Sequence, residues 1–412
     1  MLSWGIQSFA SGRLNSIMKT QTQSQRTLAS LMLLSTLLLQ PARVFGQGGL
    51  TPPGAPAPTM KSLAQVEPRT AITNSGAVTI SVPGSYYLTT NITVSAGDAI
   101  TIATNNVTLD LSGFTISSTA ASAEGAAIRL SGARTNISIY NGHVSSGVTN
   151  NNAGVYGGSG FGYGIISTLT YNLRVKEVSV GGVLYHGIDT GIGNSSVTAG
   201  CTVAGAGGYG IFTDKVSESS AFNCGGYAIY AYAAQDCVGQ SVGSGSLGIS
   251  ASTALNCYGI STGANGYGIY AYMALNCYGA GTGTNGSGLY GYSAQNCFGS
   301  ANGAATAAVY ATMALNCFGN GNNNAYGVLA TVAQGCYGSS NGNGDGIHAD
   351  NVQNCNGYSG GTGRGVYATD TAIGSSGYSG SGTGLFAYIA NSCRGNTTSG
   401  TAQSISYKYN MP

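Results

Sequence analysis

The most informative property of this 412-residue sequence is how little charge it carries. Charged residues make up only 6% of the chain, whereas a typical globular protein has ~25%. Between Cys237 and Gly344 there is no Asp, Glu, Lys, Arg or His at all. A segment without these residues lacks the carboxylates and imidazoles most used in general acid–base catalysis, and it cannot hold a metal through carboxylates or bind phosphates through a charged side chain. The net charge of +2 and the lack of a basic cluster also argue against a nucleic-acid partner.

The sequence also lacks an apolar run long enough to cross a membrane as a helix. The best candidate, residues 28–39, is too short for that purpose. It follows two basic residues and precedes small ones, which is typical of a secretory signal. Because the basic residues lie far from the N-terminus, Met18 is an alternative start. We therefore predict a signal peptide over 1–46, a Pro/Gly-rich linker over 47–70, and a secreted or cell-surface protein without a transmembrane anchor.

A short repeat takes the place of helix-length segments in the rest of the chain. Gly or Ala precedes an aliphatic residue at intervals that begin at 37, fall to 23 and settle at 18 to 20 residues. Units this short cannot bury an apolar face alone, so they predict the stacked coils of a solenoid. The 68 glycines would also fit a disordered chain, but disordered tracts do not repeat aliphatic residues in register. The repeated aliphatic residues are Ile128, Ile165, Ile188, Ile211, Ile229, Ile249, Ile269, Leu289, Val309, Val328, Ile347, Val366 and Leu385.

The local pattern within each unit is that of β-strands. From residue 71 onwards, apolar residues alternate with polar ones and are punctuated by Gly and Asn. Strands in units of about 20 residues must pair in parallel with their equivalents in the next unit, and parallel crossovers are nearly always right-handed. The sequence therefore predicts an all-β, right-handed parallel β-helix of roughly 15 rungs over 71–400, on the order of 70 Å long. Loop insertions are expected around 117–126 and 145–163, and a tail over 401–412.

Two segments carry a resemblance to a known family. Residues 106–116 (NVTLDLSGFTI) and 136–142 (NISIYNG) resemble rungs of secreted bacterial right-handed β-helix repeat proteins of the pectate-lyase-like superfamily. Residues 58–70 are similar to a leader that precedes such helices in exported proteins of environmental bacteria. The resemblance covers most of 58–395 and implies the fold. It says less about activity, since many members of that superfamily have no assigned function.

Eight of the ten cysteines lie eight residues after a repeated aliphatic residue, which indicates an inward ladder. In-register neighbours would have Cβ atoms ~4.8 Å apart, whereas a disulfide needs ~3.8 Å. We therefore expect Cys257, Cys277, Cys297, Cys317 and Cys336 to be buried and mostly unbridged. Disulfides remain the alternative for an exported chain, above all at Cys201 and Cys224, which lie off the main spacing. Gly374 takes the cysteine position in one unit, and without CxxC or a nearby His we predict no metal site.

Aromatic residues repeat at positions that should face outwards. One column follows the repeated aliphatic residue, another lies two residues further on, and a third follows the cysteines from Tyr258 to Tyr337. Such columns either stack only on themselves or form a face that contacts polysaccharide or another protein. The candidate binding residues are Tyr230, Tyr232, Tyr270, Tyr272, Tyr290, Tyr292 and Tyr310.

Charges cluster only outside the neutral segment. In pectate-lyase-like enzymes an outward face holds acidic Ca²⁺ ligands and a basic residue, so the resemblance implies a candidate site near 174–218. Asp189 and Asp214 are expected to point outwards there on neighbouring rungs. The alternative is that these are ordinary solvated charges, as for a second group from Asp345 to Asp370. The weak catalytic candidates are Lys176, Glu177, His186, Asp189, Asp214 and Lys215.

Two functional hypotheses follow from these patterns. The first is an exported, non-catalytic module that is structural, adhesive or glycan-contacting through its outward Tyr/Phe face, with polysaccharide or a cell-surface component as partner. The second is a polysaccharide lyase or glycoside hydrolase that uses the cluster near 174–218. No cofactor is expected for the first, and Ca²⁺ is implied only for a lyase. Neither hypothesis defines an oligomeric state.

Overall fold

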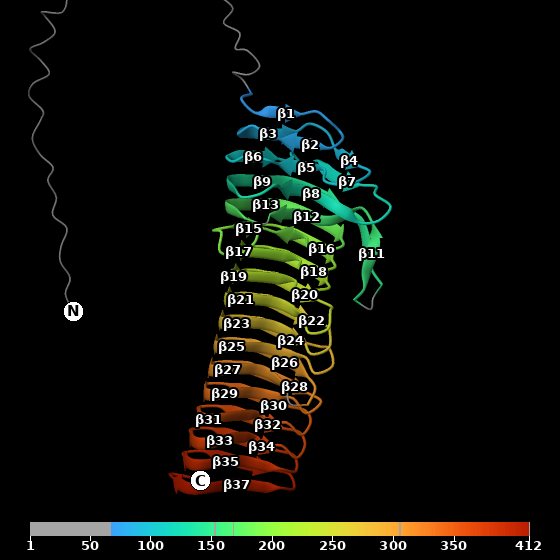
Figure 1. The fold of residues 1–412 in the computed structure, drawn as a ribbon. Coiled ribbons are helices and arrows are strands. Elements are labelled where there is room, and N and C mark those ends of the chain that lie inside the picture. The colour runs from blue at the N-terminus through green and yellow to red at the C-terminus, as the bar shows by residue number, and fades with distance from the viewer. Residues whose placement is uncertain (1–66, 152–153, 168, 305, 412) are drawn as a thin grey trace, which may run out of the picture. The chain divides into compact units, whose positions relative to one another are not determined.

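The computed structural model describes residues 67–411 except 152–153, 168 and 305. The predicted signal peptide and almost all of the linker lie outside these residues. The described part is an all-β parallel solenoid of about 17 turns without any helix, so none of it could cross a membrane as a helix (Figure 1). The predicted parallel β-helix is confirmed, with slightly more turns than expected. Its right-handed sense stays a prediction from the preference of parallel crossovers.

The first coils have three sheet faces, because each turn contains three separate strands. Strands of one face pair in parallel with their equivalents one turn further along the chain. β9 and β13 are long enough to contribute to two faces. The first face contains β1 (Thr70–Ile72), β3 (Gly84–Leu88), β6 (Val107–Asp110), β9 (Arg134–Ser145), β13 (Thr170–Val183) and β15 (Val197–Ala199); the second contains β2 (Val78–Ile80), β5 (Ile100–Ile102), β8 (Glu124–Leu130), β12 (Phe161–Ser167) and β14 (Ile188–Asp189); the third contains β4 (Ile92–Val94) and β7 (Thr115–Ser118).

The coils simplify at β17, whose first residues pair with β14 and whose last residues pair with β15. From there on each turn has one long strand that covers two faces and one short strand that covers the third. The long strands are β17 (Ile211–Ser217), β19 (Ile229–Gln235), β21 (Leu247–Leu255), β23 (Tyr267–Leu275), β25 (Ser287–Gln295), β27 (Ala307–Leu315), β29 (Tyr326–Gln334), β31 (Ile347–Gln353), β33 (Val366–Ile373), β35 (Thr383–Asn391) and β37 (Thr401–Tyr409). The short strands are β16 (Thr202–Ala206), β18 (Ser220–Cys224), β20 (Val238–Ser241), β22 (Tyr258–Ser261), β24 (Tyr278–Gly281), β26 (Phe298–Asn302), β28 (Phe318–Asn322), β30 (Tyr337–Ser340), β32 (Asn356–Ser359), β34 (Ser376–Ser379) and β36 (Arg394–Thr397).

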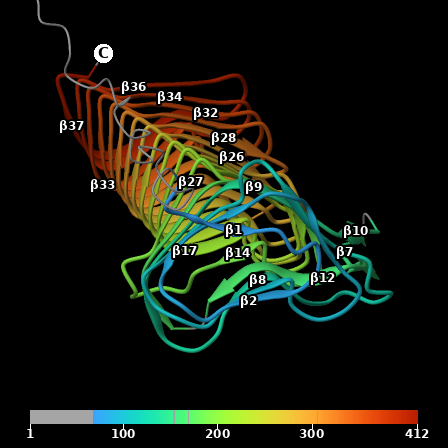
Figure 2. The same cartoon turned by 90° about the horizontal axis from the view of Figure 1, so that it is seen from above.

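The larger insertion and the C-terminal segment both contain strands. The insertion expected around 145–163 includes an antiparallel hairpin of β10 (Gly147–Asn150) and β11 (Tyr156–Ser159), which lies at the side of the stacked coils (Figure 2). The Tyr156 hydroxyl donates to the carbonyl of Asn223 at 2.6 Å, so the hairpin is tied to later coils. Residues 401–412 were expected to be a tail, whereas Thr401–Tyr409 is the strand β37, paired with β35.

Asparagine recurs because it occupies a corner where the backbone turns through a left-handed conformation. Asn256, Asn276 and Asn296 have φ values of 52–53°, which most side chains avoid and asparagine tolerates. The side chains of successive corners also form a ladder, in which Asn276 Nδ2 donates to Asn256 Oδ1 at 3.2 Å and Asn296 Nδ2 to Asn276 Oδ1 at 3.2 Å. The Asn-then-alternation pattern of the early coils has the same cause, since Asn106 and Asn136 have φ values of 57° and 58°.

Glycine is abundant because each short strand lies too close to the long strand that follows it in the chain for a side chain to fit between them. A Cβ added to Gly279 would lie 2.5 Å from the carbonyl oxygen of Gly288, and one added to Gly259 would lie 2.2 Å from that of Gly268. No side chain can be accommodated at such distances. The thin glycine-lined zone leaves the rest of the core to one column of aliphatic residues and to Ala and Cys.

The inward aliphatic column is confirmed, because Ile269 pairs with Leu289 and Leu289 with Val309, and all three are fully buried. The simple alternation beyond this column, however, was wrong. An unbroken alternation from Ile269 to Cys277 would turn Met273 and Leu275 inwards, but they are 52% and 37% exposed, while the residue between them, Ala274, is buried. The long strand bends after Tyr272. The side chains of Tyr272 and Met273 therefore both face solvent, and the alternation of inward and outward positions shifts by one residue.

All ten cysteines are buried and free, as predicted for the ladder. Strand register corrects two details of that prediction. Cys201 follows Ala199, which pairs with Ser217, so it belongs to the ladder rather than lying off it. The unit thought to have Gly374 at the cysteine position has Ser375 there instead, because β33 contains one extra residue. Ser375 Oγ donates to the Ile373 carbonyl at 2.9 Å, as Cys277 Sγ does to that of Leu275 at 3.2 Å.

Burial keeps the thiols of Cys201 and Cys224 protonated. Loss of hydration raises the pKa of Cys201 to about 11 and that of Cys224 to about 12. Because the thiolate is the reactive form, such cysteines are unreactive while the solenoid is folded.

Substitution of Asn276 tests whether the corner requires a residue that tolerates positive φ. Asn276→Ala should lower the free energy of unfolding by about 1–2 kcal/mol, because alanine is disfavoured at positive φ and cannot continue the amide ladder. Asn276→Gly is the matched control and should cost less, since Gly335 and Gly374 occupy the equivalent corner in other coils with φ of 64° and 58°. Urea unfolding followed by circular dichroism measures both. An alanine variant as stable as the glycine variant would contradict the explanation.

Thiol titration tests the ladder. In denaturant without reductant all ten cysteines should react, whereas few or none should react in the folded protein, because burial keeps the thiols inaccessible. The reduced, denatured protein is the control for complete reaction. A deficit of thiols that reductant restores would reveal disulfides and contradict the free ladder.

Candidate binding face

The outward aromatic residues form stacks whose spacing is set by the strands beneath them. Tyr270, Tyr290 and Tyr310 pair in register on β23, β25 and β27. Their ring centroids are 5.1 and 4.6 Å apart and the planes are within 5° of parallel. Tyr272 and Tyr292 stack beside them at 4.9 Å. These distances match the ~4.8 Å between paired strands, so each stack follows from the coil repeat.

A second stack lies at the start of the short strands, where it was also expected. Adjacent ring centroids along it are 4.6 to 5.0 Å apart. A further stacked pair, Tyr358 with Tyr378 at 5.3 Å, was not expected because it lies elsewhere in its coil. The five rings of the second stack are Tyr258, Tyr278, Phe298, Phe318 and Tyr337.

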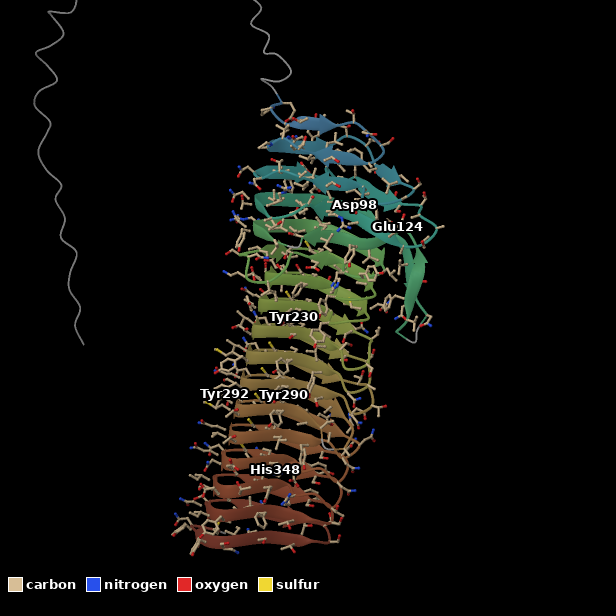
Figure 3. All side chains as sticks on the ribbon, in the orientation of Figure 1. Asp98, Glu124, Tyr230, Tyr290, Tyr292 and His348 are labelled. Carbon is tan, nitrogen blue, oxygen red and sulfur yellow. The ribbon has the colours of Figure 1, made fainter. Side chains whose placement is uncertain are left out.

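The two tyrosine columns enclose a shallow groove of about 440 Å³ along the long strands. We refer to its tyrosines as the aromatic face. The groove floor contains Ala231, Ala251, Ala271 and Gly291. Tyr290 and Tyr292 project from the same coil, and Tyr230 lies further towards the N-terminal coils (Figure 3). All seven tyrosines predicted as binding residues line this groove: Tyr230, Tyr232, Tyr270, Tyr272, Tyr290, Tyr292 and Tyr310.

Sequence reasoning missed one feature of the groove. In β21 the two outward positions that carry tyrosine in neighbouring coils are Ser250 and Ser252, and both serines line the groove. The signal was present in the sequence as a repeat that reads ISAS instead of IYAY. It interrupts both columns between Tyr230 and Tyr270.

The residues of the first charged group lie apart on the solenoid. Arg174 and Lys215 occupy one column, separated by Val197, on the face of β13, β15 and β17. His186 instead packs among aromatic rings, with its centroid 5.8 Å from that of Tyr163 and 4.9 Å from that of Tyr209. None of the ion pairs among the described residues involves the six catalytic candidates.

Asp214 was expected to face solvent, but it is buried. It occupies the outward bend position, where a loop folds over it and saturates its carboxylate. The backbone amides of Asn194 and Ser196 each donate to Oδ2 at 2.8 Å, and the amide of Gly193 donates to Oδ1. A carboxylate with these partners holds the loop in place and has little capacity left for a ligand.

Asp189 is the candidate with an altered acidity. Burial raises the pKa of its carboxyl to about 6, and a hydrogen bond from the Gly191 amide to Oδ1 at 3.2 Å only partly offsets this. Burial likewise lowers the pKa of His186. Both changes follow from removing the charged form of each group from water, without help from an opposite charge.

The second charged group is a compact ion-pair cluster. Asp345, whose side chain is 4% exposed, accepts from His348 Nδ1 at 2.9 Å and from Arg364 Nη2 at 2.9 Å. Burial would raise the pKa of Asp345, but these two hydrogen bonds outweigh it and hold the pKa below its usual value. Arg364 also lies 3.5 Å from the ring centroid of Tyr367. The cluster satisfies its own charges beside the neutral segment.

No group of three or more His, Cys, Asp or Glu side chains within the described part of the chain is arranged to hold a metal ion. The comparisons add no relative, because no protein-family model, curated protein or solved structure matches this chain. The resemblance to the pectate-lyase-like superfamily therefore stays a prediction beyond the parallel solenoid itself.

The acidity of Asp189 predicts a pH dependence of stability. Its pKa is raised to about 6 from the usual 3.8, so the folded protein binds this proton more tightly than the unfolded chain. The resulting stabilisation is complete below about pH 4 and is lost as the pH rises through 6. Compared with the wild type, Asp189→Asn should lose less stability between pH 4 and pH 7 in urea unfolding. Asp370→Asn, at an exposed carboxylate, is the control, and equal losses in Asp189→Asn and wild type would contradict the prediction.

Proposed function

We propose that this protein is an exported, non-catalytic module that contacts polysaccharide at a cell surface through its aromatic face. The observation that carries the proposal is the groove between the two tyrosine columns in a segment without charge. Exposed aromatic side chains bind the apolar faces of sugar rings, and their hydroxyl groups add hydrogen bonds. Tyr272 is 58% exposed and Tyr270 is 44% exposed, so both can take part.

The extent of the face also favours contact with an extended partner. The tyrosines lie on successive coils, and the repeat presents similar groups at regular intervals along the solenoid. A polymer with its own regular repeat can therefore touch several coils at once, so that weak contacts add up. The predicted signal peptide over 1–46 supports a secreted or cell-surface location for such a contact.

The alternative, a polysaccharide lyase or hydrolase, has weaker support. Lyase chemistry needs a base close to a cation that neutralises the substrate acid. Lys176 and Lys215 lie on the face of β13 and β15, whereas Asp189 lies on that of β14. Asp214 is occupied by backbone amides. We therefore propose no catalytic residue, and no cofactor enters the proposal.

Substitution of the central stack tests the proposal. The triple variant Tyr270→Ser, Tyr290→Ser and Tyr310→Ser should lose binding to immobilised polysaccharide, because it removes three of the four tyrosines in one wall of the groove. Binding by the wild type should change little between low and moderate salt, since stacking is not screened over the Debye length of ~8–10 Å. Co-sedimentation with insoluble polysaccharides measures both effects.

The matched control is the triple variant Tyr258→Ser, Tyr278→Ser and Phe298→Ser, which removes as many stacked rings outside the groove. It should bind like the wild type. Circular dichroism establishes that both variants keep the β-solenoid. Binding that survives in the groove variant, or that disappears in moderate salt, would contradict the proposal.

A further inference from the structure

The aromatic face has one interruption, and its geometry is that of a site rather than a defect. Ser250 pairs in register with Tyr230 on one side and with Tyr270 on the other. Ser252 holds the corresponding place between Tyr232 and Tyr272, one position further on than the paired residues Ala231, Ala251 and Ala271. We call this space the serine slot: its floor is Ser250 and Ser252, and its walls are the four tyrosines.

The tyrosines on the two sides of the serine slot do not contact one another. Tyr230 makes its ring contacts on the N-terminal side, with Tyr209, Phe212 and Tyr227. Tyr270 makes its contacts with Tyr267 and Tyr290. Among the described residues no ring contact links Tyr230 with Tyr270, or Tyr232 with Tyr272. The aromatic stacks therefore end on either side of the slot, each with a free ring face.

The width of the slot leaves room for one ring. Walls two coils apart are separated by ~9.6 Å, twice the strand spacing. A flat aromatic ring placed midway would lie ~4.8 Å from each wall, which is the spacing at which the tyrosines of the other coils stack. A saturated, puckered ring is thicker, because axial C–H bonds project from both faces, and it would touch both walls. A pyranose has this shape and carries its hydroxyl groups at the edge.

The floor of the slot suits such an edge. Ser250 is 7% exposed although it occupies an outward position, because the taller tyrosines shade it, whereas Ser252 is exposed. Neither hydroxyl makes a hydrogen bond to any described residue. Each can therefore donate to or accept from a ligand hydroxyl without losing a protein partner.

The charge of the surroundings narrows the ligand further. The slot belongs to the segment between Cys237 and Gly344, which has no ionisable residue other than Tyr and Cys. A uronate or a nucleotide would need a cation for its carboxylate or phosphate. A neutral sugar needs none.

We propose that the serine slot binds one pyranose ring of a neutral polysaccharide, held between two pairs of tyrosines with its edge hydroxyls on Ser250 and Ser252. This inference rests on the proposed function. It places the most specific sugar contact of the aromatic face on one coil, that of β21. The tyrosines beyond Tyr270 and Tyr272 then support neighbouring sugar units along the groove.

The test fills the slot with the residues that neighbouring coils carry. The double variant Ser250→Tyr and Ser252→Tyr restores the IYAY pattern, so the stacks become continuous and the fold is supported. The matched control is Leu329→Tyr and Thr331→Tyr, which adds the same two rings at the equivalent positions of β29, away from the slot. Co-sedimentation of the full chain with cellulose, xylan, mannan and chitin, and with polygalacturonate as an anionic polymer, measures binding.

The wild type and the β29 control should bind at least one neutral polymer, and the filled-slot variant should bind it at least about tenfold more weakly, which corresponds to about 1.4 kcal/mol. Ser250→Ala with Ser252→Ala should weaken binding less, because it keeps the walls. Undiminished binding by the filled-slot variant would overturn the slot but leave the proposed function intact. Failure of the wild type to bind any polymer would overturn both. A preference for polygalacturonate, or a wild-type dimer in sedimentation that the filled-slot variant loses, would overturn the neutral sugar as the occupant.

Discussion

Parallel backbone pairing between successive coils is the constraint on which the rest of this structure depends. Each residue of a coil lies ~4.8 Å from its equivalent in the next, whatever the side chain is. A repeated residue therefore becomes a column, and its own chemistry decides what the column does. Aliphatic residues form the core, asparagines form amide ladders at the corners, cysteines form a buried line of thiols and tyrosines form stacks.

The narrow interior determines the composition. Because the short and long strands approach within contact of their backbones, glycine predominates at the contact positions of both, as at Gly279 and Gly288. The space that remains is filled by small residues such as Ala274 and Cys277. Charges cannot be placed inside such a core without large cost, so they lie in the wider N-terminal coils or in clusters like that of Asp345 and Arg364. The neutral, tyrosine-rich surface of the central coils follows from the same arrangement.

Because the tyrosine columns repeat from coil to coil, their interruption in β21 is a distinct structural feature. Two serines on a sheet would mean little in an irregular protein. In β21, however, they stand where the coils on either side have tyrosines, so the tyrosine stacks end on both sides of the serines. The proposed function depends on the continuous part of the aromatic face. The serine slot adds to that face a space between two pairs of tyrosines. Neither feature needs a charged group, which suits a segment that has none.

The sequence by itself determined the all-β solenoid, the inward aliphatic column, the buried cysteines and the outward tyrosines, because each depends only on a period along the chain. Other features do not follow from the period of the sequence and were decided by the tertiary structure. The bend in the long strand exposes Met273 and Leu275, and one extra residue in β33 moves the cysteine position from Gly374 to Ser375. A loop covers Asp214 and removes it from the surface. The distance between Tyr230 and Tyr270, and hence the slot, exists only once the coils are stacked, because no local pattern specifies what lies across two turns of backbone.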